Sequence, residues 1–229
     1  MDDKTNIISV TGDIHGCYFT LKSLFDKIKS KTDEHYSVGD LIDRGLYSRE
    51  VVQFCYENNI KPIKGNHEDM MLNAISDPEF KGFSNSYSNL EIWYANGGSM
   101  TQNSYIYSKN RKKFNLFCEE FTNTHHFNYI KSFPLKMEIG NVILTHGGII
   151  EYQSETDVLW NRSIPDKLDK LQIIGHTPVE EFVYVKNHFV NIDTGCVYGN
   201  ALTAVLVDIQ KREILEIIKE ELNENDKNN

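Results

Sequence analysis

Five short polar segments of this chain each follow an apolar run, and their side chains carry lone pairs that can bind a metal ion. The candidate ligands in these segments are Asp13, His15, Asp40, Asn66, His146 and His176. Glycines beside them allow sharp turns and close approach of neighbouring loops. Ligands of open α/β sheets bind at the carboxyl ends of the strands. We therefore expect these side chains to meet at one site.

The residue types select the chemistry of that site. A mixed set of oxygen and nitrogen ligands without a thiolate suits manganese, iron or zinc, and not an iron–sulfur cluster or copper(I). Six ligands are too many for one catalytic ion with an open position, but they suit two divalent ions that share Asp40. Two ions about 3.5–4 Å apart can clamp an in-line displacement at phosphorus. Their four positive charges outnumber the three negative charges of two aspartates and a hydroxide. The site would therefore attract a phosphate dianion.

Each motif taken alone has an ordinary structural explanation. A single Gly-Asp is most often a turn, the pair Asp43 and Arg44 most often a surface ion pair, and a strand-end His146 most often a satisfied, semi-buried side chain. The spacing argues against this explanation, because Asp13 and Asp40 are 27 residues apart and Asp40 and Asn66 are 26 apart. Each interval is the length of one strand–helix unit, so the recurrence indicates a common site.

The elements that must position these residues alternate over the first third of the chain. Strands are predicted at residues 7–11, 36–38 and 60–63, and helices at residues 17–30, 48–57 and 68–75. This alternation predicts a parallel sheet layered with helices. Residues 78–133 break the rhythm, and we interpret them as a helical insertion with helices at residues 89–95 and 112–121.

The remaining chain is predicted to be rich in strands. A second, mostly antiparallel set is expected at residues 135–139, 142–145, 171–174, 182–186, 189–192, 201–209 and 213–218. Gly140 and Asn141 form a good hairpin turn between the first two. We expect one domain over residues 1–219 that includes the insertion, and a frayed polar tail over residues 220–229.

Composition limits the class of protein. The chain has 229 residues, of which 40% are hydrophobic and 25% charged, as in ordinary globular proteins. The net charge of −9 argues against broad binding to nucleic acid. No apolar run approaches the roughly 18 residues of a membrane helix, and no secretory leader follows Met1, so a cytoplasmic protein is expected. Four scattered cysteines form no CxxC pair and are expected to be reduced. The oligomeric state is left open.

The motifs resemble the GDxHG, GDxxDRG and GNHE set of the PPP-type metallophosphoesterases, and most of all the compact bacterial and phage (lambda-type) protein phosphatases. The resemblance runs over residues 7–209 and includes the later THGG, GHTP and NIDTG segments. It implies an α/β (α+β) fold, the calcineurin-like β-sandwich of mixed sheets flanked by helices. It also implies hydrolysis by direct attack of a hydroxide that bridges two metal ions, manganese first and iron or zinc as alternatives.

The resemblance also implies a role for each matching residue. One ion would be bound by Asp13, His15 and Asp40. The other would be bound by Asp40, Asn66, His146 and His176. His67 would be the general acid, and the carboxylate of Asp43 would orient it. Arg44 and Arg162 would bind the phosphate. Arg162 rests on the order of the short WNR segment alone.

Several functions are compatible with these motifs. The first expectation is a phosphatase for phosphoserine and phosphothreonine in proteins, and the second is a dinucleoside polyphosphate hydrolase of the diadenosine tetraphosphate type. A polynucleotide end phosphatase or cyclic phosphodiesterase is disfavoured by the acidic charge. A metal-binding scaffold without activity would be marked by loss of His67, Asp43 or a ligand, and all are present.

Other polar and aromatic residues receive structural interpretations. The histidines outside the motifs are expected at the surface or in packing contacts, namely His35, His125, His126 and His188. The basic residues 109–113 are read as a solvated helix start. The aromatic residues of the insertion are expected to pack it internally, namely Tyr87, Trp93, Tyr94, Tyr105 and Tyr107. Tyr198 is expected near the metals.

Overall fold

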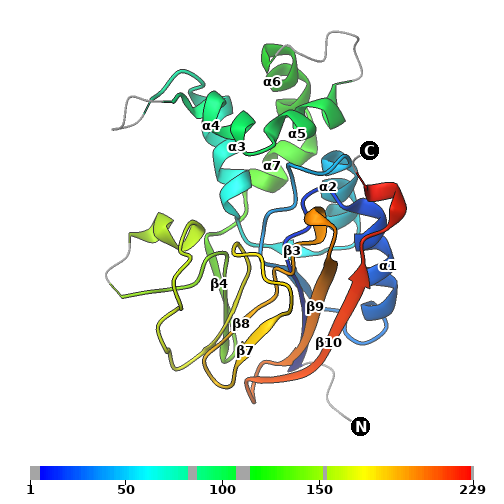
Figure 1. Ribbon diagram of the computed structural model, residues 1–229, viewed down its shortest axis with the longest axis vertical. Coiled ribbons are helices and arrows are strands. Elements are labelled where there is room, and N and C mark those ends of the chain that lie inside the picture. The colour runs from blue at the N-terminus through cyan, green and yellow to red at the C-terminus, as the bar shows by residue number, and fades with distance from the viewer. Residues whose placement is uncertain (1–5, 82–86, 107–113, 152–153, 228–229) are drawn as a thin grey trace.

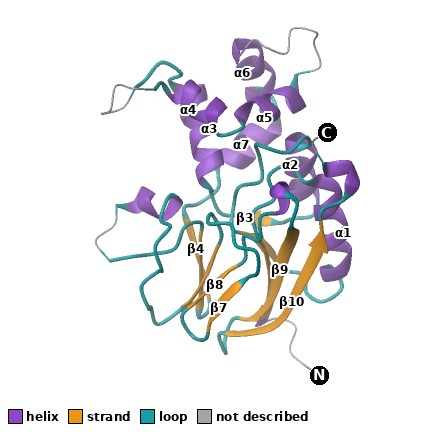
Figure 2. Cartoon of the chain, in the orientation of Figure 1, coloured by secondary structure: helices purple, strands orange, loops and turns teal. Residues whose placement is uncertain are grey.

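Two five-stranded sheets face each other, and helices cover the outer face of one of them (Figures 1 and 2). The structure is a computed structural model that describes residues 6–81, 87–106, 114–151 and 154–227. The strand orders are β10-β9-β1-β2-β3 and β4-β5-β6-β8-β7. No described helix is long and apolar enough to cross a membrane.

The first sheet contains the predicted parallel strands. β1 (Ile7–Thr11), β2 (His35–Ser37) and β3 (Lys61–Pro62) run parallel, and α1 (Tyr18–Ile28) and α2 (Ser48–Glu57) connect them. β9 (Ala201–Asp208) pairs antiparallel with β1, and β10 (Glu213–Glu221) pairs antiparallel with β9. The prediction that placed these last two strands in the second set is wrong. They extend the first sheet.

The second sheet is mixed, not mostly antiparallel as predicted. Its strands are β4 (Lys136–Ile139), β5 (Val142–Thr145), β6 (Leu171–Ile174), β7 (Val183–Val185) and β8 (Phe189–Asn191). The pair β4–β5 is antiparallel, as the hairpin turn predicts, and so is β7–β8. β5, β6 and β8 are parallel neighbours. The connections between these three strands are long enough to return the chain to the same end of the sheet.

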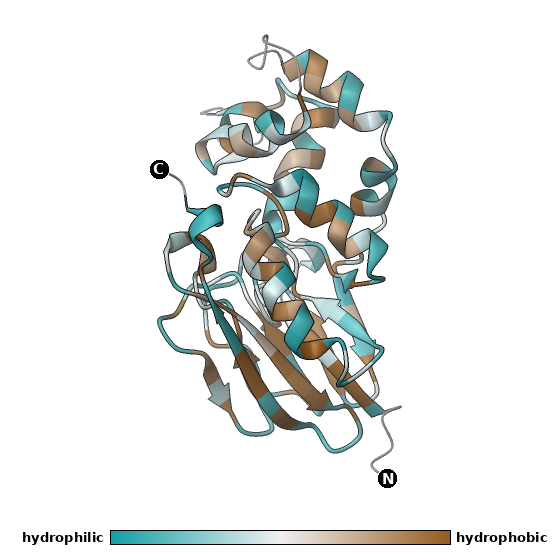
Figure 3. Ribbon diagram, turned by 90° about the vertical axis from the view of Figure 1, so that its right-hand side faces the viewer, coloured by the Kyte–Doolittle hydropathy of each residue, from teal (hydrophilic) through white to brown (hydrophobic). Residues whose placement is uncertain are grey.

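The core has two parts because alternate side chains of a strand point to opposite faces. In β9, Val205 and Val207 pack between the two sheets, whereas Ala204 and Leu206 pack beneath the helices. In the view of Figure 3, apolar colour runs along the strands and marks the helices that cover them. The two sheets are therefore held together by a shared apolar core.

The helical insertion is the group α4 (Asn89–Ala95), α5 (Gly98–Tyr105), α6 (Phe114–Thr122) and α7 (His125–Lys131), which follows α3 (Asn66–Ser76). It lies above the strand ends in Figure 1. The predicted helix at residues 89–95 is confirmed, and the one at residues 112–121 corresponds to α6. The basic residues 109–113 and Tyr107 lie outside the described residues. Short 3-10 turns occur at η2 (Glu155–Leu159), η3 (Cys196–Tyr198) and η4 (Glu224–Asp226).

Residues 220–227 are docked on the domain, which corrects the prediction of a frayed tail for this part of residues 220–229. β10 continues to Glu221, and the buried Asp226 carboxylate lies at the start of α1. It accepts hydrogen bonds from the backbone N–H groups of Phe19 and Thr20 at 3.1 and 2.7 Å. The first N–H groups of a helix have no partner within the helix, so this distant carboxylate serves as its cap.

The four cysteines are free, as predicted. Cys17, Cys55 and Cys196 are buried and Cys118 is half-buried. Of the other histidines, His126 is buried between the hydroxyl of Tyr105 and the side chain of Gln53. It is therefore a packing histidine, as expected.

Candidate active site

The predicted ligands come from both sheets and meet at the carboxyl ends of their parallel strands. Asp13 and His15 follow β1, and Asp40 follows β2. Asn66 begins α3 after β3, while His146 and His176 follow β5 and β6. All six side chains are buried, with at most 5% of any residue exposed. The sandwich thus joins two separate strand-end clusters into one centre.

The carboxylate of Asp40 occupies the middle of this centre. Its Oδ2 lies 3.2 Å from Nε2 of His146, 3.5 Å from Nε2 of His15 and 3.9 Å from Nε2 of His67. Two groups of side chains each have ligand atoms within 4.8 Å of one another, and both groups include Asp40. They are His15 with His67, and Asp13 with His146. Asp40 is therefore placed as a shared ligand requires, although the two groups differ in membership from the implied ligand sets.

Unpartnered polar atoms show that the centre fits divalent cations. Oδ1 of Asp13 and Nε2 of His176 are buried without a hydrogen-bond partner among the described residues. Oδ1 of Asn66 lies 2.9 Å from both Nε2 of His146 and Nδ1 of His176. Buried polar atoms without a partner are costly. Cations bound by these oxygen and nitrogen atoms would satisfy them.

Backbone carbonyls orient two of the histidine rings. Nδ1 of His15 lies 2.8 Å from the carbonyl oxygen of Ile42, and Nδ1 of His146 lies 2.7 Å from that of Val38. Each Nδ1 donates its hydrogen to the carbonyl, so Nε2 faces the centre. This arrangement fixes the ring orientation of metal-binding histidines in general. The bond from His146 to Val38 also ties the second sheet to the first.

Charge at the centre favours a cation. Burial raises the pKa of Asp13 well above its usual range, and the neighbouring carboxylate of Asp193 raises it further. Burial alone would lower the pKa of His146, but the carboxylates of Asp40 and Asp13 raise it to about 10. A proton on His146 therefore balances part of the negative charge. A divalent ion would replace that proton, since metal ligation releases protons from its ligands.

The backbone at the centre is strained. Among the described residues, eight that are not glycine have positive φ, and five of these are site residues. The five are His15, Asp40, Asp43, Arg44 and His176. Such conformations cost free energy and persist only where the surroundings enforce them, which is typical of functional sites. No feature of the sequence predicts this strain.

The four residues with predicted catalytic roles also lie at this centre. Nδ1 of His67 is 2.8 Å from Oδ2 of Asp43, and both side chains are fully buried. Nη1 of Arg44 lies 2.5 Å from Nε2 of His15. Nη1 of Arg162 donates to the carbonyl oxygen of His176 at 3.3 Å. The structure thus brings together all ten residues that the sequence singled out.

The same segment of the chain matches a protein-family model. Residues 8–210 match the model described as calcineurin-like phosphoesterase. The chain belongs to this family. Two sheets packed face to face with flanking helices are its predicted fold, and the structure confirms that prediction. Calcineurin-like phosphoesterases use divalent metal ions, in agreement with the donor set described above.

The similar proteins include both nucleosyl-tetraphosphatases and serine/threonine-protein phosphatases. The chain is 29% identical to the asymmetrical bis(5'-nucleosyl)-tetraphosphatase PrpE of Oceanobacillus iheyensis, over 86% of this chain and 87% of that protein. It is 27% identical to serine/threonine-protein phosphatase 1 of Salmonella typhimurium, over 85% and 88%. The solved structure of a metallophosphoesterase from Sphaerobacter thermophilus has the same fold, with a TM-score of 0.59 at 15% identity, over 95% of this chain and 89% of that one.

Several residues that support the site are not among those predicted from the sequence. Glu68 is fully buried, and its carboxylate accepts hydrogen bonds from the backbone N–H groups of Asp40, Leu41 and Gly65. It ties the loop after β2 to the start of α3. Glu68 is the last residue of the GNHE motif, and this position was the sequence signal that could have identified it.

Two further groups at the centre were missed. Asp193 is buried beside Asp13, and burial raises its pKa to about 6. Trp93 and Thr101 of the helical insertion bind the carboxylate of Asp43. Trp93 was interpreted as internal packing, and Thr101 carried no signal at all.

Proposed function

We propose that the chain hydrolyses phosphoesters directly, at a centre of two divalent ions held by the six predicted ligands. Manganese is the first candidate for both ions, and iron or zinc are the alternatives. When bound, the ions would lower the pKa of a water molecule and polarise the phosphoryl oxygens. The protein would hold the ions with Asp13, His15, Asp40, Asn66, His146 and His176.

The observation that carries the proposal is the pair formed by His67 and Asp43. Nε2 of His67 is buried without a hydrogen-bond partner among the described residues and lies 3.9 Å from Oδ2 of Asp40. The Asp43 carboxylate holds the other ring nitrogen, so Nε2 points to the reacting centre. A proton delivered there would neutralise a leaving alkoxide. An ester of a serine or threonine needs this proton, because an alkoxide is a strong base.

The protonation of His67 depends on the substrate. Burial lowers the pKa of His67 to about 4, and the carboxylate of Asp40 partly opposes this. A phosphate dianion beside Nε2 would raise that pKa, since a nearby opposite charge stabilises the imidazolium. The two divalent ions act in the opposite direction, so the general-acid role requires that the substrate dianion outweigh them.

Two arginines would orient the phosphate. A guanidinium presents several N–H donors in one plane, which matches phosphate oxygens better than an ammonium does. Arg44 lies beside His15, and Arg162 lies beside His176, so the two guanidinium groups approach different sides of the centre. They would fix the phosphoryl group in line with the attacking water.

The first substrate candidate is phosphoserine and phosphothreonine in proteins, as in the compact bacterial and phage phosphatases. The acid–carboxylate pair supports it, because these esters have poor leaving groups. The similarity to the Salmonella serine/threonine-protein phosphatase also supports it.

A dinucleoside tetraphosphate is the second candidate, and two exposed aromatic rings favour it. The Trp160 ring lies 6.0 Å from that of His176, and the guanidinium carbon of Arg44 lies 5.5 Å from the centre of the Tyr198 ring. These aromatic residues are 46% and 59% exposed. Exposed aromatic rings can stack on nucleobases. The similarity to the tetraphosphatase of Oceanobacillus supports this candidate as well.

One experiment separates these proposals. The protein is prepared free of metal, supplied with manganese, and given a phosphothreonine peptide, a phosphotyrosine peptide and diadenosine tetraphosphate. We expect manganese-dependent turnover, fastest on the phosphothreonine peptide, and a loss of roughly 100-fold or more in His67→Asn. His188→Asn is the control, since His188 contacts Pro165 outside the centre. Dominant cleavage of the dinucleotide would replace the first candidate by the second. Absence of metal-dependent turnover on all three would refute the activity.

A further inference from the structure

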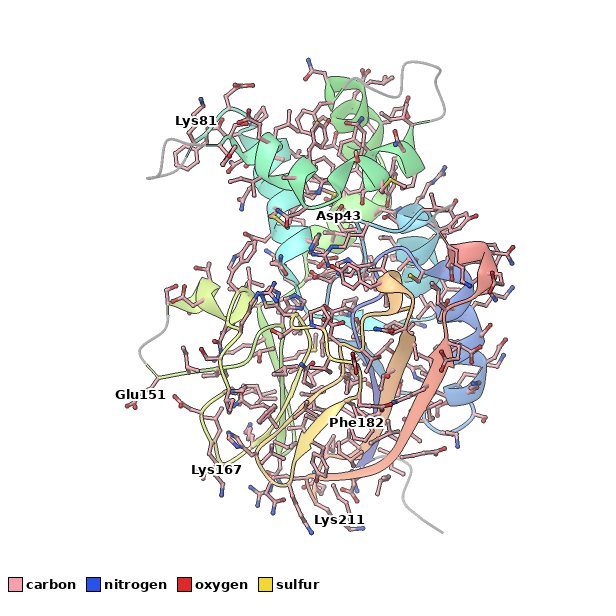
Figure 4. All side chains as sticks on the ribbon, in the orientation of Figure 1. Asp43, Lys81, Glu151, Lys167, Phe182 and Lys211 are labelled. Carbon is pink, nitrogen blue, oxygen red and sulfur yellow. The ribbon has the colours of Figure 1, made fainter. Side chains whose placement is uncertain are left out.

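The carboxylate of Asp43 is enclosed by two side chains of the helical insertion. Nε1 of Trp93 donates to both carboxylate oxygens, at 3.1 Å to Oδ1 and 3.0 Å to Oδ2. The hydroxyl of Thr101 donates to Oδ1 at 2.6 Å. All three side chains are fully buried. Asp43 itself lies where the insertion meets the sheets (Figure 4). The Asp43 carboxylate, which orients His67, is thus itself fixed by the helical insertion.

The turn between two helices of the insertion places these two donors beside Asp43. Trp93 lies in α4 and Thr101 lies in α5, and the two helices are joined by Asn96 and Gly97, with Gly98 as the first residue of α5. A β-carbon at Gly98 would collide with the Trp93 indole. The carbonyl oxygen of Gly97 accepts a hydrogen bond from the backbone N–H of Arg44 at 3.3 Å. The turn between α4 and α5 therefore packs directly on the segment that carries Asp43 and Arg44.

The indole is also fixed from behind. Its ring centroid lies 5.4 Å from that of Phe117, which is fully buried in α6. A buried indole N–H usually finds some hydrogen-bond partner, so burial alone would account for a single such bond. Here the indole and the Thr101 hydroxyl both reach the same carboxylate. The backbone N–H of Asp43 donates back to Thr101 Oγ1 at 2.8 Å, which closes the contact.

We propose that Trp93 and Thr101 are positioning residues for proton delivery by His67. They fix the rotation of the Asp43 carboxylate, so that Oδ2 holds Nδ1 of His67 and Nε2 faces the phosphoester. The proposal rests on the proposed function, because it assumes that His67 protonates the leaving group. The helical insertion is then part of the catalytic apparatus and not only a cover over the strand ends.

The physical reason lies in the freedom of a carboxylate to rotate. Without the indole N–H, the Asp43 carboxylate loses the donor that contacts both of its oxygens, so it can rotate. The His67 ring can then shift. Small displacements of a catalytic group cost a large part of its contribution. The loss is confined to reactions that need the proton. A substrate whose leaving group is stable as an anion should react almost unchanged.

The test therefore compares two leaving groups. Trp93→Phe keeps an aromatic ring but removes the N–H, and Thr101→Val keeps the shape but removes the hydroxyl. We expect each to lower kcat on a phosphothreonine peptide by roughly 10-fold, a fraction of the full general-acid effect. On 4-nitrophenyl phosphate, whose leaving group needs no proton, each should lower kcat by less than about 3-fold on the same basis. Thr101→Ser, which retains the hydroxyl, should restore turnover of the peptide.

Matched controls separate positioning from folding. Tyr94→Phe removes a hydroxyl that contacts Gln102 on the same helices but does not reach Asp43, so both substrates should react as with the unaltered chain. In a His67→Asn background, Trp93→Phe should have no further effect on either substrate. Equal losses on both substrates in Trp93→Phe and Thr101→Val would overturn the proposal.

The same measurements distinguish an error in the proposed function from an error in the positioning proposal. If His67→Asn slows both substrates equally, the general-acid role itself is wrong, and the positioning proposal falls with it. If His67→Asn is selective for the peptide but Trp93→Phe and Thr101→Val are not, only the positioning proposal is wrong.

Discussion

The Glu68 carboxylate accepts a hydrogen bond from the backbone N–H of Asp40 at 2.9 Å, and through this bond the third motif positions the central residue of the second. The same carboxylate also accepts from Leu41 and Gly65, so the loop after β2 and the start of α3 share one buried acceptor. The proposed shared ligand is thus fixed by a residue that lies outside the proposed ligand set.

Replacement of Glu68 by Gln should weaken both the fold and metal binding. The amide keeps one acceptor oxygen and turns its NH₂ group toward backbone N–H donors, which leaves buried donors without a partner. We expect the free energy of unfolding to fall by about 1–3 kcal/mol. Urea unfolding of the metal-free protein measures this loss, and calorimetric titration with manganese measures the affinity. An unfolding free energy and an affinity equal to those of the unaltered chain would contradict this role. Glu224→Gln, at the exposed end of the chain, is the control.

Replacement of Gly175 by Ala should weaken metal binding and also lower the stability of the fold, because its β-carbon would meet the buried Val38 side chain as well. Its backbone conformation is open to any residue, but a β-carbon there would collide with Oδ1 of Asp13. Displacement of that carboxylate should reduce manganese affinity by roughly 10- to 100-fold, the scale found for residues that orient metal ligands. Calorimetric titration gives the affinity, and thermal unfolding without metal verifies the fold. An unchanged affinity would show that Asp13 is not a ligand.

Replacement of Asp226 by Ala should destabilise the protein without affecting the chemistry. The carboxylate caps α1 and also accepts from the Thr20 hydroxyl at 2.7 Å. Loss of a helix cap costs about 0.5–2 kcal/mol. The midpoint of urea unfolding should fall accordingly, while kcat with manganese stays constant. A midpoint equal to that of the unaltered chain would show that the C-terminal segment does not hold α1.

His126 should make the stability of the protein fall between pH 6.5 and pH 4. Burial lowers the pKa of His126 to about 4 in the folded state, and the ordinary value of 6.5 applies to the unfolded chain. Between these values the unfolded chain binds the additional proton, so stability is full above pH 6.5 and is lost as the pH falls. The loss grows as the pH falls from 6.5 toward 4. His126→Gln should have a flatter dependence of unfolding free energy on pH between 7 and 5, and an equally steep one would refute the assignment.

The positions of the proposed ligands and of the His67–Asp43 pair were predictable because each of these residues lies in a short motif directly after a strand. Asp13, Asp40 and Asn66 recur at the length of one strand–helix unit, so local pattern and topology carry the same information. The contact between Trp93 and Asp43 spans 50 residues, and that between Thr20 and Asp226 spans 206. Contacts of that separation leave no periodic pattern in the chain.

The misplacement of β9 and β10 has a similar cause. Their sequences indicate strands, but β9 pairs with β1, which lies almost 200 residues earlier in the chain. Every residue of β9 is buried, so its two faces are equally compatible with either sheet. The partner of such a strand is decided by packing of the whole sandwich and not by its own pattern.

The sharing of Asp40 by two divalent ions is the feature on which the proposed chemistry depends most. Crystals of the protein grown with manganese, measured at the manganese absorption edge, test it directly. We expect two anomalous peaks about 3.5–4 Å apart, one on each side of the Asp40 carboxylate, with Asp13, His15, Asn66, His146 and His176 as the other ligands. A single peak, or two peaks of which only one contacts Asp40, would contradict it.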